Sequence, residues 1–311
     1  MNEPSVIALN SRSGEVLAMG HEAWQMIGRT PSYIVAVRPL RKGAITDFEV
    51  TQRMIRLLLQ RVGVSRLNRP RVVICVPSAI TAVERRAVTE AARRAGAADA
   101  RLIEQPVAAA IGADLPINEP IGNMVVDIGG GTTESALISL GGVVALEAVR
   151  VGSFDIDNAI QGYVRREYGI AVGERTAEEI KVQMGSAWPL PEEVTADIRG
   201  RDLISGLPRT IQLTTEHVRE ALEEPVSAIV DAVKAALDRT PPELAADIME
   251  EGITLTGGGA LLQGLPDRLA HETGMPIRIA EDPLFSVVIG SGKALENIDA
   301  MRSLMSLGGD L

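Results

Sequence analysis

Aromatic and basic residues are scarce in this sequence. Only 3% of its 311 residues are aromatic, so stacking on nucleic-acid bases is not an expected mode of binding. Lysine and arginine total 31 against 41 aspartates and glutamates, which gives a formal net charge of −10. Because general nucleic-acid binding depends on concentrated basic residues, this balance argues against a nucleic-acid partner.

Disulfides, metal-ligand spacing and long apolar runs are also missing. Cys75 is the one cysteine, so no intrachain disulfide can form, and its apolar sequence neighbours predict a buried, inert thiol. His21, His217 and His271 are scattered without ligand spacing, which argues against structural zinc. No run reaches the ~18 apolar residues of a membrane span, and no signal sequence opens the chain. We therefore expect a cytoplasmic protein in a reducing compartment.

The sequence contains enough apolar material for two domains of mixed α/β structure. Its length exceeds what one core usually supports, and 46% of its residues are hydrophobic. Asp47 and the pair of Thr81 and Glu84 are helix-capping signals. The patterns predict strands at 6–9, 16–20, 34–37, 72–76, 100–103 and 195–203. They predict helices at 47–61, 81–95, 106–112, 154–168, 176–184, around Lys293, and at 216–238 with an interruption near Pro225.

An acidic residue at the end of an apolar strand opens into a glycine run. Asp127 follows residues 123–126, and the chain continues as Ile128-Gly129-Gly130-Gly131-Thr132-Thr133. Glycines let backbone N–H groups approach a polyphosphate, and unpaired amides in such a turn form an anion-binding concavity. Asp127 suits the Mg²⁺ that accompanies nucleotide phosphates, since this ion prefers oxygen ligands. A plain hairpin turn is the alternative, because another apolar run follows at 135–140.

A second strand of β-branched residues also enters a glycine run. Residues 253–256 lead into Gly257, Gly258 and Gly259, and Ala260 follows. We interpret the two strand-and-glycine signals as marking two halves of a nucleotide-binding fold.

Short segments with a distinctive order and spacing run along almost the whole chain. They include Asn2-Glu3-Pro4-Ser5-Val6, Met26-Ile27-Gly28-Arg29-Thr30-Pro31, Val76-Pro77-Ser78, Pro106-Val107-Ala108-Ala109-Ala110-Ile111-Gly112, Gly173-Glu174-Arg175-Thr176-Ala177-Glu178, Thr240-Pro241-Pro242-Glu243-Leu244 and Glu281-Asp282-Pro283-Leu284. Together with both glycine runs, they resemble the superfamily of actin, sugar kinases and heat-shock chaperones. Within it, the chain is identified as a member of the MreB family of bacterial actins.

The resemblance implies an α/β, duplicated actin-like ATPase fold. Each of its two domains would have a mixed central sheet flanked by helices, with a nucleotide cleft between the domains. We expect a first domain at 1–124, with a small subdomain at about 20–65, and a second at 125–311, with one at about 174–250. The implied cofactors are ATP and Mg²⁺. The resemblance assigns the phosphates and metal to Asp127, Gly129, Gly130, Gly131 and Thr132, and the adenosine to Gly257, Gly258, Gly259 and Ala260.

The helix predicted at 176–184 carries the remaining nucleotide candidates. Glu178 and Lys181 stand at positions i and i+3 and therefore share a face of the helix. Their spacing alone favours an exposed ion pair. The matching helix of the superfamily contacts the ribose and the adenine edge, so the resemblance assigns that role to Glu174, Thr176, Ala177, Glu178 and Lys181.

The family pattern also implies where water is activated. In actin-like ATPases, a carboxylate or amide just before a proline orients water for attack on the γ-phosphate. Here that residue is Gln105, with Glu104 as a fallback base if the register differs by one. Thr132 or Thr133 would be a second water-orienting hydroxyl. Because an amide is a poor proton acceptor, we expect slow ATP hydrolysis.

The implied function is a cytoskeletal filament that directs cell-wall synthesis and rod shape. The resemblance implies a homopolymer of antiparallel double protofilaments on the inner membrane surface, together with membrane-bound cell-wall synthesis and shape proteins as partners. Residues 62–67, with apolar groups beside Arg66, are a candidate for shallow membrane contact, and an ordinary connection is equally compatible. Slow hydrolysis suits assembly, because retained nucleotide can hold two domains in one orientation.

Two alternatives remain open from the sequence. Members of the family begin with another strand and a first phosphate loop, Asp-Leu-Gly-Thr-Ala-Asn-Thr, before the segment that here follows Met1. Either the start was assigned too late or that loop is absent, and its absence would favour a nucleotide-weak scaffold of the same fold. A phosphotransferase or chaperone ATPase is less favoured, because no substrate-facing carboxylate or peptide-binding domain is evident.

Overall fold

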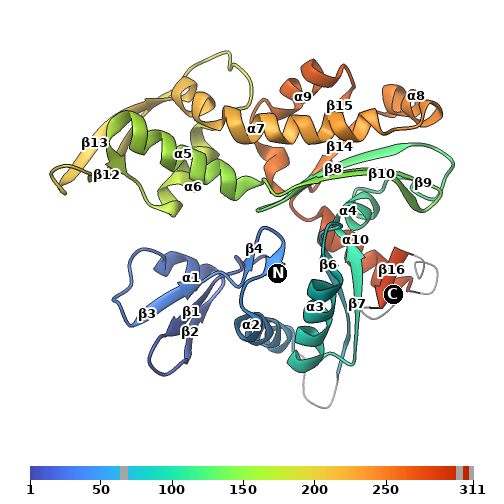
Figure 1. Cartoon of the computed structure of the whole chain (residues 1–311), viewed down its shortest axis with the longest axis horizontal. Coiled ribbons are helices and arrows are strands. Elements are labelled where there is room, and N and C mark those ends of the chain that lie inside the picture. The colour runs from blue at the N-terminus through green and yellow to red at the C-terminus, as the bar shows by residue number, and fades with distance from the viewer. Residues whose placement is uncertain (64–68, 299–303, 308–311) are drawn as a thin grey trace. The chain divides into compact units, whose positions relative to one another are not determined.

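The computed structural model describes residues 1–63, 69–298 and 304–307. The chain packs as two compact units (Figure 1): unit 1 comprises Met1–Glu104 and Leu295–Leu311, and unit 2 comprises Gln105–Ala294. The division into domains 1–124 and 125–311, with their subdomains, stays a prediction.

A three-stranded antiparallel sheet opens unit 1. Strand β1 (Ile7–Asn10) lies between β2 (Val16–Met19) and β3 (Ile34–Val37). One face packs on α2 (Phe48–Arg61) and the other on α1 (His21–Met26). This alternation of side chains buries both faces of β1 and explains why so short a sheet can form.

The second sheet of unit 1 leads toward unit 2 along the chain. Strand β7 (Asp99–Glu104) lies between β6 (Arg71–Val76), to which it is parallel, and β16 (Met305–Leu307). Helix α3 (Ala82–Ala95) packs its alanines against β6 and β7. A small hairpin of β4 (Leu40–Arg41) and β5 (Ala44–Ile45) precedes α2.

The predicted helix caps of unit 1 are confirmed. The Asp47 carboxylate accepts the Val50 N–H at 3.0 Å and begins α2. At α3, the Thr81 hydroxyl accepts the Glu84 N–H at 3.2 Å, while the Glu84 carboxylate accepts the Thr81 N–H at 2.8 Å. Such reciprocal capping satisfies two N–H groups that a helix start otherwise leaves unbonded.

Unit 2 is built on a five-stranded sheet in the order β10-β9-β8-β14-β15. Strands β8 (Asn123–Ile128), β9 (Thr133–Ser139) and β10 (Gly142–Val149) form an antiparallel meander, and β14 (Ile253–Thr256) and β15 (Ile277–Ile279) run parallel to β8. The interpretation of the two glycine runs as marks of two halves is wrong. Both belong to this one sheet, because β8 and β14 are neighbours.

Helices and a second sheet surround the central sheet of unit 2. The second sheet has the order β11 (Ile170–Ala171), β12 (Thr195–Asp202) and β13 (Pro208–Thr214). The helical elements are α4 (Gln105–Gly112), α5 (Ser153–Tyr168), α6 (Glu174–Met184), α7 (Thr215–Asp238), α8 (Pro242–Glu251), the 3-10 helix η1 (Gly258–Leu261), α9 (Leu265–Thr273) and α10 (Ser286–Glu296).

Helix α7 corrects one expectation, because it runs without interruption through Pro225. Proline has no N–H to donate to the carbonyl four residues earlier, which usually kinks or ends a helix. Here Pro225 is buried, and Leu222, Val226 and Ile229 beside it are almost completely buried in the core. Apolar packing on both sides of the proline therefore outweighs the lost hydrogen bond.

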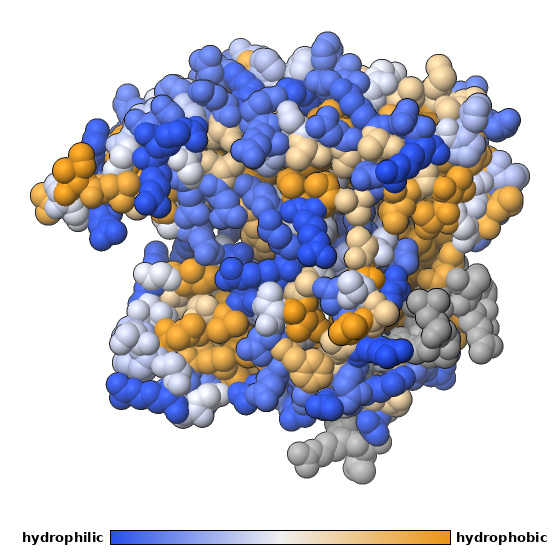
Figure 2. Space-filling view, viewed as in Figure 1, coloured by the Kyte–Doolittle hydropathy of each residue, from blue (hydrophilic) through white to orange (hydrophobic). Residues whose placement is uncertain are grey.

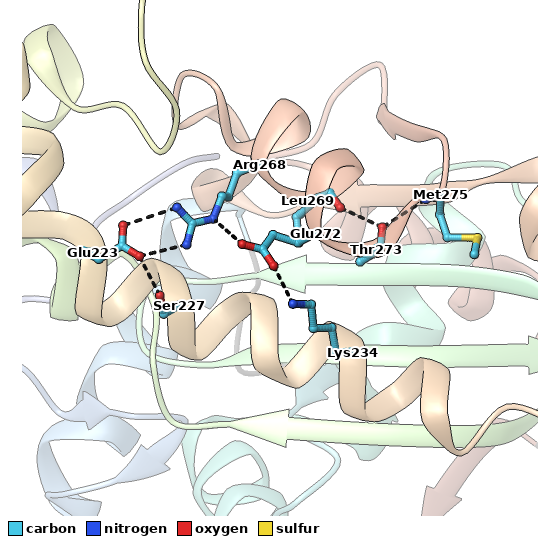
Figure 3. Close-up of polar contacts among 8 residues, drawn as sticks. All are labelled: Glu223, Ser227, Lys234, Arg268, Leu269, Glu272, Thr273 and Met275. Atoms are coloured by element: carbon cyan, nitrogen blue, oxygen red, sulfur yellow. Dashed lines mark hydrogen bonds and ion pairs between the residues drawn. The ribbon is translucent and has the colours of Figure 1, made fainter.

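Ion pairs fasten α9 to α7 (Figure 3). The Arg268 guanidinium pairs with Glu223 at 2.8 Å and with Glu272 at 3.2 Å, and Lys234 donates to Glu272 at 2.5 Å. The hydrogen bond from Lys234, with its positive charge, lowers the pKa of Glu272. Because only residues 262–264 separate η1 from α9, this network also fixes the end of the second glycine segment.

Two glycines let α4 and α10 cross at backbone contact. A methyl group added at Gly112 would lie 1.8 Å from the Ser286 carbonyl oxygen, and one added at Gly290 would lie 1.8 Å from that of Ala108. The Lys293 ammonium also donates to the carboxylate of Asp114. Helix α4, which begins at Gln105, is thus held by a close helix crossing at Ala108 and Gly112.

No helix in the described part of the chain combines the length and the apolar character that crossing a membrane requires. Of the candidate membrane loop at 62–67, the residues Val64, Ser65, Arg66 and Leu67 lie outside the described residues.

The helix crossing predicts opposite effects for two substitutions in α10. Gly290→Ala should lower the free energy of unfolding by about 2 to 3 kcal/mol, because its methyl group overlaps the backbone of α4. Gly292→Ala should raise it by about 0.5 to 1 kcal/mol, since nothing lies within 4 Å of the added carbon and alanine favours helix. Urea unfolding of both variants measures this. Equal effects of the two substitutions would contradict the close crossing.

Candidate functional site

The first glycine run is a tight turn between β8 and β9. Ile128 pairs with Thr133, and the Gly129 N–H donates to the Thr132 carbonyl at 2.9 Å. The hairpin alternative is therefore correct as a description of the backbone. Within the described residues, the N–H groups of Gly130, Gly131 and Thr132 have no acceptor. Three consecutive unbonded donors are what an anion-binding turn requires, so the two interpretations are compatible.

The start of α5 orients this turn. The Ser153 N–H donates to the Gly129 carbonyl at 3.0 Å, and the Phe154 N–H donates to the Gly130 carbonyl at 2.8 Å. A methyl group added at Gly152 would lie 2.7 Å from the Gly129 carbonyl oxygen, so glycine is needed there for close approach. In a trans peptide, C=O and N–H point in opposite directions. The N–H groups of Gly130 and Gly131 therefore point away from α5.

Asp127 lies where β8 and β14 end together. It is paired in register with Thr256, whose hydroxyl donates to Asp127 Oδ1 at 3.1 Å. Burial raises the pKa of Asp127 to about 6, and the hydrogen bond from Thr256 opposes this shift. No cationic side chain in the described ranges forms an ion pair with Asp127. A buried carboxylate without a cation, beside a turn with free N–H groups, fits a site for Mg²⁺ bound to phosphate.

The second glycine run packs directly on β8. Gly257 has a φ of 79°, and a methyl group there would lie 2.3 Å from the Ile128 carbonyl oxygen. A methyl group at Gly259 would lie 2.2 Å from Ile128 Cγ2, whereas one at Gly258 would meet only the end of the Leu284 side chain, at 3.2 Å. Ala260 is buried in the core. The fold itself therefore needs Gly257 and Gly259, while Gly258 leaves open space.

A cavity of about 170 Å³ joins the second glycine run to α6. Lys181 brings a charge to it, and its ammonium pairs with Asp157 of α5 at 2.9 Å, with both side chains largely buried. The lining residues are Ser153, Ile156, Lys181, Val182, Gly185, Gly258, Gly259, Leu261, Leu262 and Gln263. Segments far apart in sequence thus supply a mostly apolar recess with one fixed cation.

The other candidates on α6 lie outside this lining. The Ala177 side chain is completely buried in the core. Glu174 is exposed, and Thr176 and Glu178 are half-buried. Spacing alone favoured an ion pair of Lys181 with Glu178, but the structure pairs Lys181 with Asp157. Assignment of Glu174, Thr176, Ala177 and Glu178 to a nucleoside stays a prediction.

The hydrolysis candidates divide into two groups. The Thr132 hydroxyl donates to Gln105 Oε1 at 3.5 Å, so these two polar groups face each other at the first glycine turn. Thr133 is completely buried, and its hydroxyl donates to the Val151 carbonyl at 2.9 Å. Glu104 ends β7 and accepts a hydrogen bond from Arg85 at 3.0 Å. Gln105 and Thr132 are therefore the better-placed pair.

Sequence reasoning missed Gly152, Thr256 and Asp157. Gly152 lies directly before α5, and Thr256 directly before the second glycine run, so position next to known signals could have suggested them. Asp157 gave no such signal, because its pairing with Lys181 depends on how α5 and α6 pack.

The sequence is similar to that of a known protein family. A family profile described as MreB/Mbl protein matches residues 1–303. The "Cell shape-determining protein MreB" of Escherichia coli (strain K12) is 53% identical over 305 residues, which cover 96% of this chain and 88% of that protein. The "Cell shape-determining protein Mbl" of Bacillus subtilis (strain 168) is 49% identical over 302 residues, or 97% and 91% of the two chains.

Solved structures give the same result. A crystal structure of MreB 5 of Spiroplasma citri bound to AMPPNP has a TM-score of 0.91 and 36% identity, and the match covers 97% of this chain and 91% of that one. A MamK double helical filament has a TM-score of 0.79 with 94% and 91% coverage. At 20% identity, that second likeness concerns the fold alone.

Burial of Asp127 without a cation predicts a pH-dependent loss of stability in the metal-free chain. Its pKa is near 3.8 when unfolded and about 6 when folded, so the folded state binds the proton more tightly. The contribution of Asp127 to stability therefore falls as pH rises from about 4 to about 6, by on the order of 3 kcal/mol in all. Asp127→Asn should remove this loss, so the variant should be the more stable chain at pH 7.5 and similar at pH 4.

Urea unfolding in EDTA without nucleotide measures this difference. Asp157→Asn is the matched control, because that buried aspartate has Lys181 as a cation and its neutralisation should destabilise the chain. A lower stability of Asp127→Asn than of the unaltered chain at pH 7.5 would contradict the argument.

Proposed function

The chain belongs to the MreB/Mbl family and has its actin-like α/β fold, and from this premise we propose that it is an ATP-dependent filament protein that determines cell shape. The observation that carries the proposal is the meeting of both glycine segments at Asp127. Parallel pairing of β8 with β14 sets free N–H groups, a buried carboxylate and an apolar recess beside one another.

Different parts of this site suit the phosphates, the metal ion and the nucleoside of a nucleoside triphosphate. The N–H groups of Gly130, Gly131 and Thr132 would bind phosphate oxygens, and Asp127 would hold Mg²⁺ directly or through water. When bound, that ion neutralises charge on the phosphates. Gly258 and Gly259 would lie under the adenosine, with Lys181 at the recess. The AMPPNP and ADP bound in crystal structures of MreB 5 of Spiroplasma citri support nucleotide binding by this chain.

Gln105 and Thr132 would orient the attacking water. An amide oxygen and a hydroxyl can each accept a hydrogen bond from water, which aligns it with the γ-phosphate. Neither group is a strong base, so hydrolysis should be slow. A slow step after assembly allows nucleotide state to control how long a filament persists.

We place the filament at the inner face of the cell membrane, next to membrane-bound cell-wall synthesis proteins. The names of the relatives, cell shape-determining proteins of Escherichia coli and Bacillus subtilis, support this role. Antiparallel double protofilaments are the arrangement that we propose. Many subunits on one filament would convert weak single contacts with the membrane into firm attachment.

Substitution of Gln105 tests the function. With Mg-ATP, the purified chain should sediment as filaments and release phosphate slowly, and without nucleotide it should remain in the supernatant. Gln105→Ala should bind a fluorescent ATP analogue with unchanged affinity and assemble, while phosphate release falls about 10-fold or more, because water is no longer aligned. Equal loss of binding and hydrolysis would mean that Gln105 is structural. Absence of nucleotide binding by the unaltered chain would contradict the function.

Gly258 offers a separate test of the nucleoside position. Gly258→Val should weaken binding of the ATP analogue by at least about 10-fold, because its side chain would fill the space under the nucleoside, while the melting temperature changes little. Gly259→Val is the contrasting control and should destabilise the chain itself through overlap with Ile128. Unchanged affinity of a folded Gly258→Val chain would move the nucleoside elsewhere.

A further inference from the structure

Ser153 lies where the first glycine turn meets the recess. It begins α5, and its N–H donates to the Gly129 carbonyl at 3.0 Å. Its own carbonyl accepts a hydrogen bond from the Lys181 ammonium at 3.4 Å, and the residue is part of the lining of the recess. The backbone of Ser153 therefore connects the turn that carries free N–H groups to the ammonium group at the recess.

The backbone contacts of Ser153 leave its hydroxyl group available. Among the described residues, none forms a hydrogen bond with Ser153 Oγ, and the residue is half-buried. A serine hydroxyl can donate one hydrogen bond and accept two. Ser153 thus brings to the recess a neutral group that can bond to a donor or to an acceptor of a ligand.

The other polar side chains of the lining belong to Lys181 and Gln263. The Lys181 ammonium pairs with Asp157 at 2.9 Å. Gln263 lies beyond η1, and its carbonyl accepts the Ala187 N–H at 2.7 Å. Of the three polar lining residues, Ser153 is the one that the described part of the chain shows hydrogen-bonded to the first glycine turn. The neutral hydroxyl that lies closest to the phosphate side of the recess is therefore that of Ser153.

Apolar side chains and glycines make up the rest of the lining. Val182 and Leu261 belong to it and are exposed although they are apolar. Figure 2 shows that hydrophilic residues cover most of the visible face of unit 2, with hydrophobic residues in separate patches. Exposed apolar side chains beside glycines suit the flat face of a base. They cannot form hydrogen bonds with the hydroxyl groups of a sugar, so a sugar at this site needs another partner.

The order of these parts matches the order of the groups in a nucleotide. In the proposed site, the phosphates lie at the N–H groups of Gly130, Gly131 and Thr132, and the nucleoside lies over Gly258. The sugar joins the phosphates to the base, so it must lie between the first turn and the glycine end of the recess. Ser153 contacts the first turn and lines the recess, which is the position that a residue bonded to the sugar requires.

We propose that the Ser153 hydroxyl forms a hydrogen bond with a ribose hydroxyl and thereby makes the site select ribonucleotides over deoxyribonucleotides. The inference rests on the proposed nucleotide function and names the residue that distinguishes the sugar. The α6 candidates Glu174 and Glu178 lie outside the lining of the recess, whereas Ser153 is part of it. A site that bonds to a ligand hydroxyl discriminates against the analogue without it, because the polar group of the protein is then left unpaired.

Titration calorimetry with unlabelled nucleotides measures the sugar preference. Each of Mg-2′-deoxy-ATP and Mg-3′-deoxy-ATP lacks one oxygen of Mg-ATP, so the analogue that binds more weakly identifies the ribose hydroxyl that is bonded. The unaltered chain should bind ATP about 5-fold more tightly than that analogue. Ser153→Ala should bind ATP about 5-fold more weakly than the unaltered chain and show no preference, because it keeps both backbone hydrogen bonds and loses only the hydroxyl.

Ser186→Ala is the matched control for removal of a serine hydroxyl near the recess. Ser186 is completely buried beside Gly185 of the lining, and its hydroxyl accepts a hydrogen bond from Arg219 at 3.3 Å. Loss of this hydroxyl should lower the melting temperature, and the ratio of the affinities for ATP and the deoxy analogue should remain that of the unaltered chain.

The outcomes separate the role of Ser153 from nucleotide binding itself. Equal affinities of the unaltered chain for all three nucleotides, or a preference that persists in Ser153→Ala, would overturn the contact with the sugar and leave the proposed function standing. Equal losses of affinity for ATP and both analogues in Ser153→Ala would also overturn it, since a hydroxyl bonded to the sugar affects one analogue differently. An unaltered chain that binds none of the nucleotides would overturn the proposed function.

Discussion

The parallel pairing of β8 with β14 determines the geometry of unit 2. It aligns Asp127 with Thr256 in register, so both strands end at the same level. Because each strand continues into glycines, the two turns must lie beside each other at that edge. Close approach of Gly257 and Gly259 to Ile128 then fixes the second turn at backbone distance. A shift of this register by one residue would exchange the faces of the β14 side chains and separate the two turns.

Helix α7 connects the central sheet to other elements of the unit. It packs on β9 and β10 and binds α9 through Arg268 and its carboxylate partners. The other parts of the site are held in similar ways: α5 on the first turn, α6 by the pairing of Lys181 with Asp157, and α4 by its crossing with α10. The site is therefore positioned by elements that are rigid for reasons unrelated to any ligand.

Local chemistry was predictable from the sequence, and pairing over long distances was not. The caps at Asp47 and Thr81 depend on neighbours within three residues, so their residue types suffice to predict them. The continuity of α7 through Pro225 depends on the core around it, which no local pattern contains. The same holds for the two glycine runs: each was recognised as a strand end, but their assignment to separate halves failed because sequence does not reveal strand neighbours. Resemblance to a family supplied the fold class, whereas the partners of Lys181 and Thr133 required coordinates.

Asp127 is a residue that the isolated chain would hold more comfortably in another form. Burial raises the pKa of its carboxyl to about 6, and a neutral amide in its place would not carry that cost. Packing explains the glycines at 112, 257, 259 and 290, but it does not explain a buried carboxylate beside unbonded N–H groups. In the proposed site, a cation on Asp127 would remove the cost of its burial. The local instability of this carboxylate is therefore the physical argument that joins it to the glycine turns beside it.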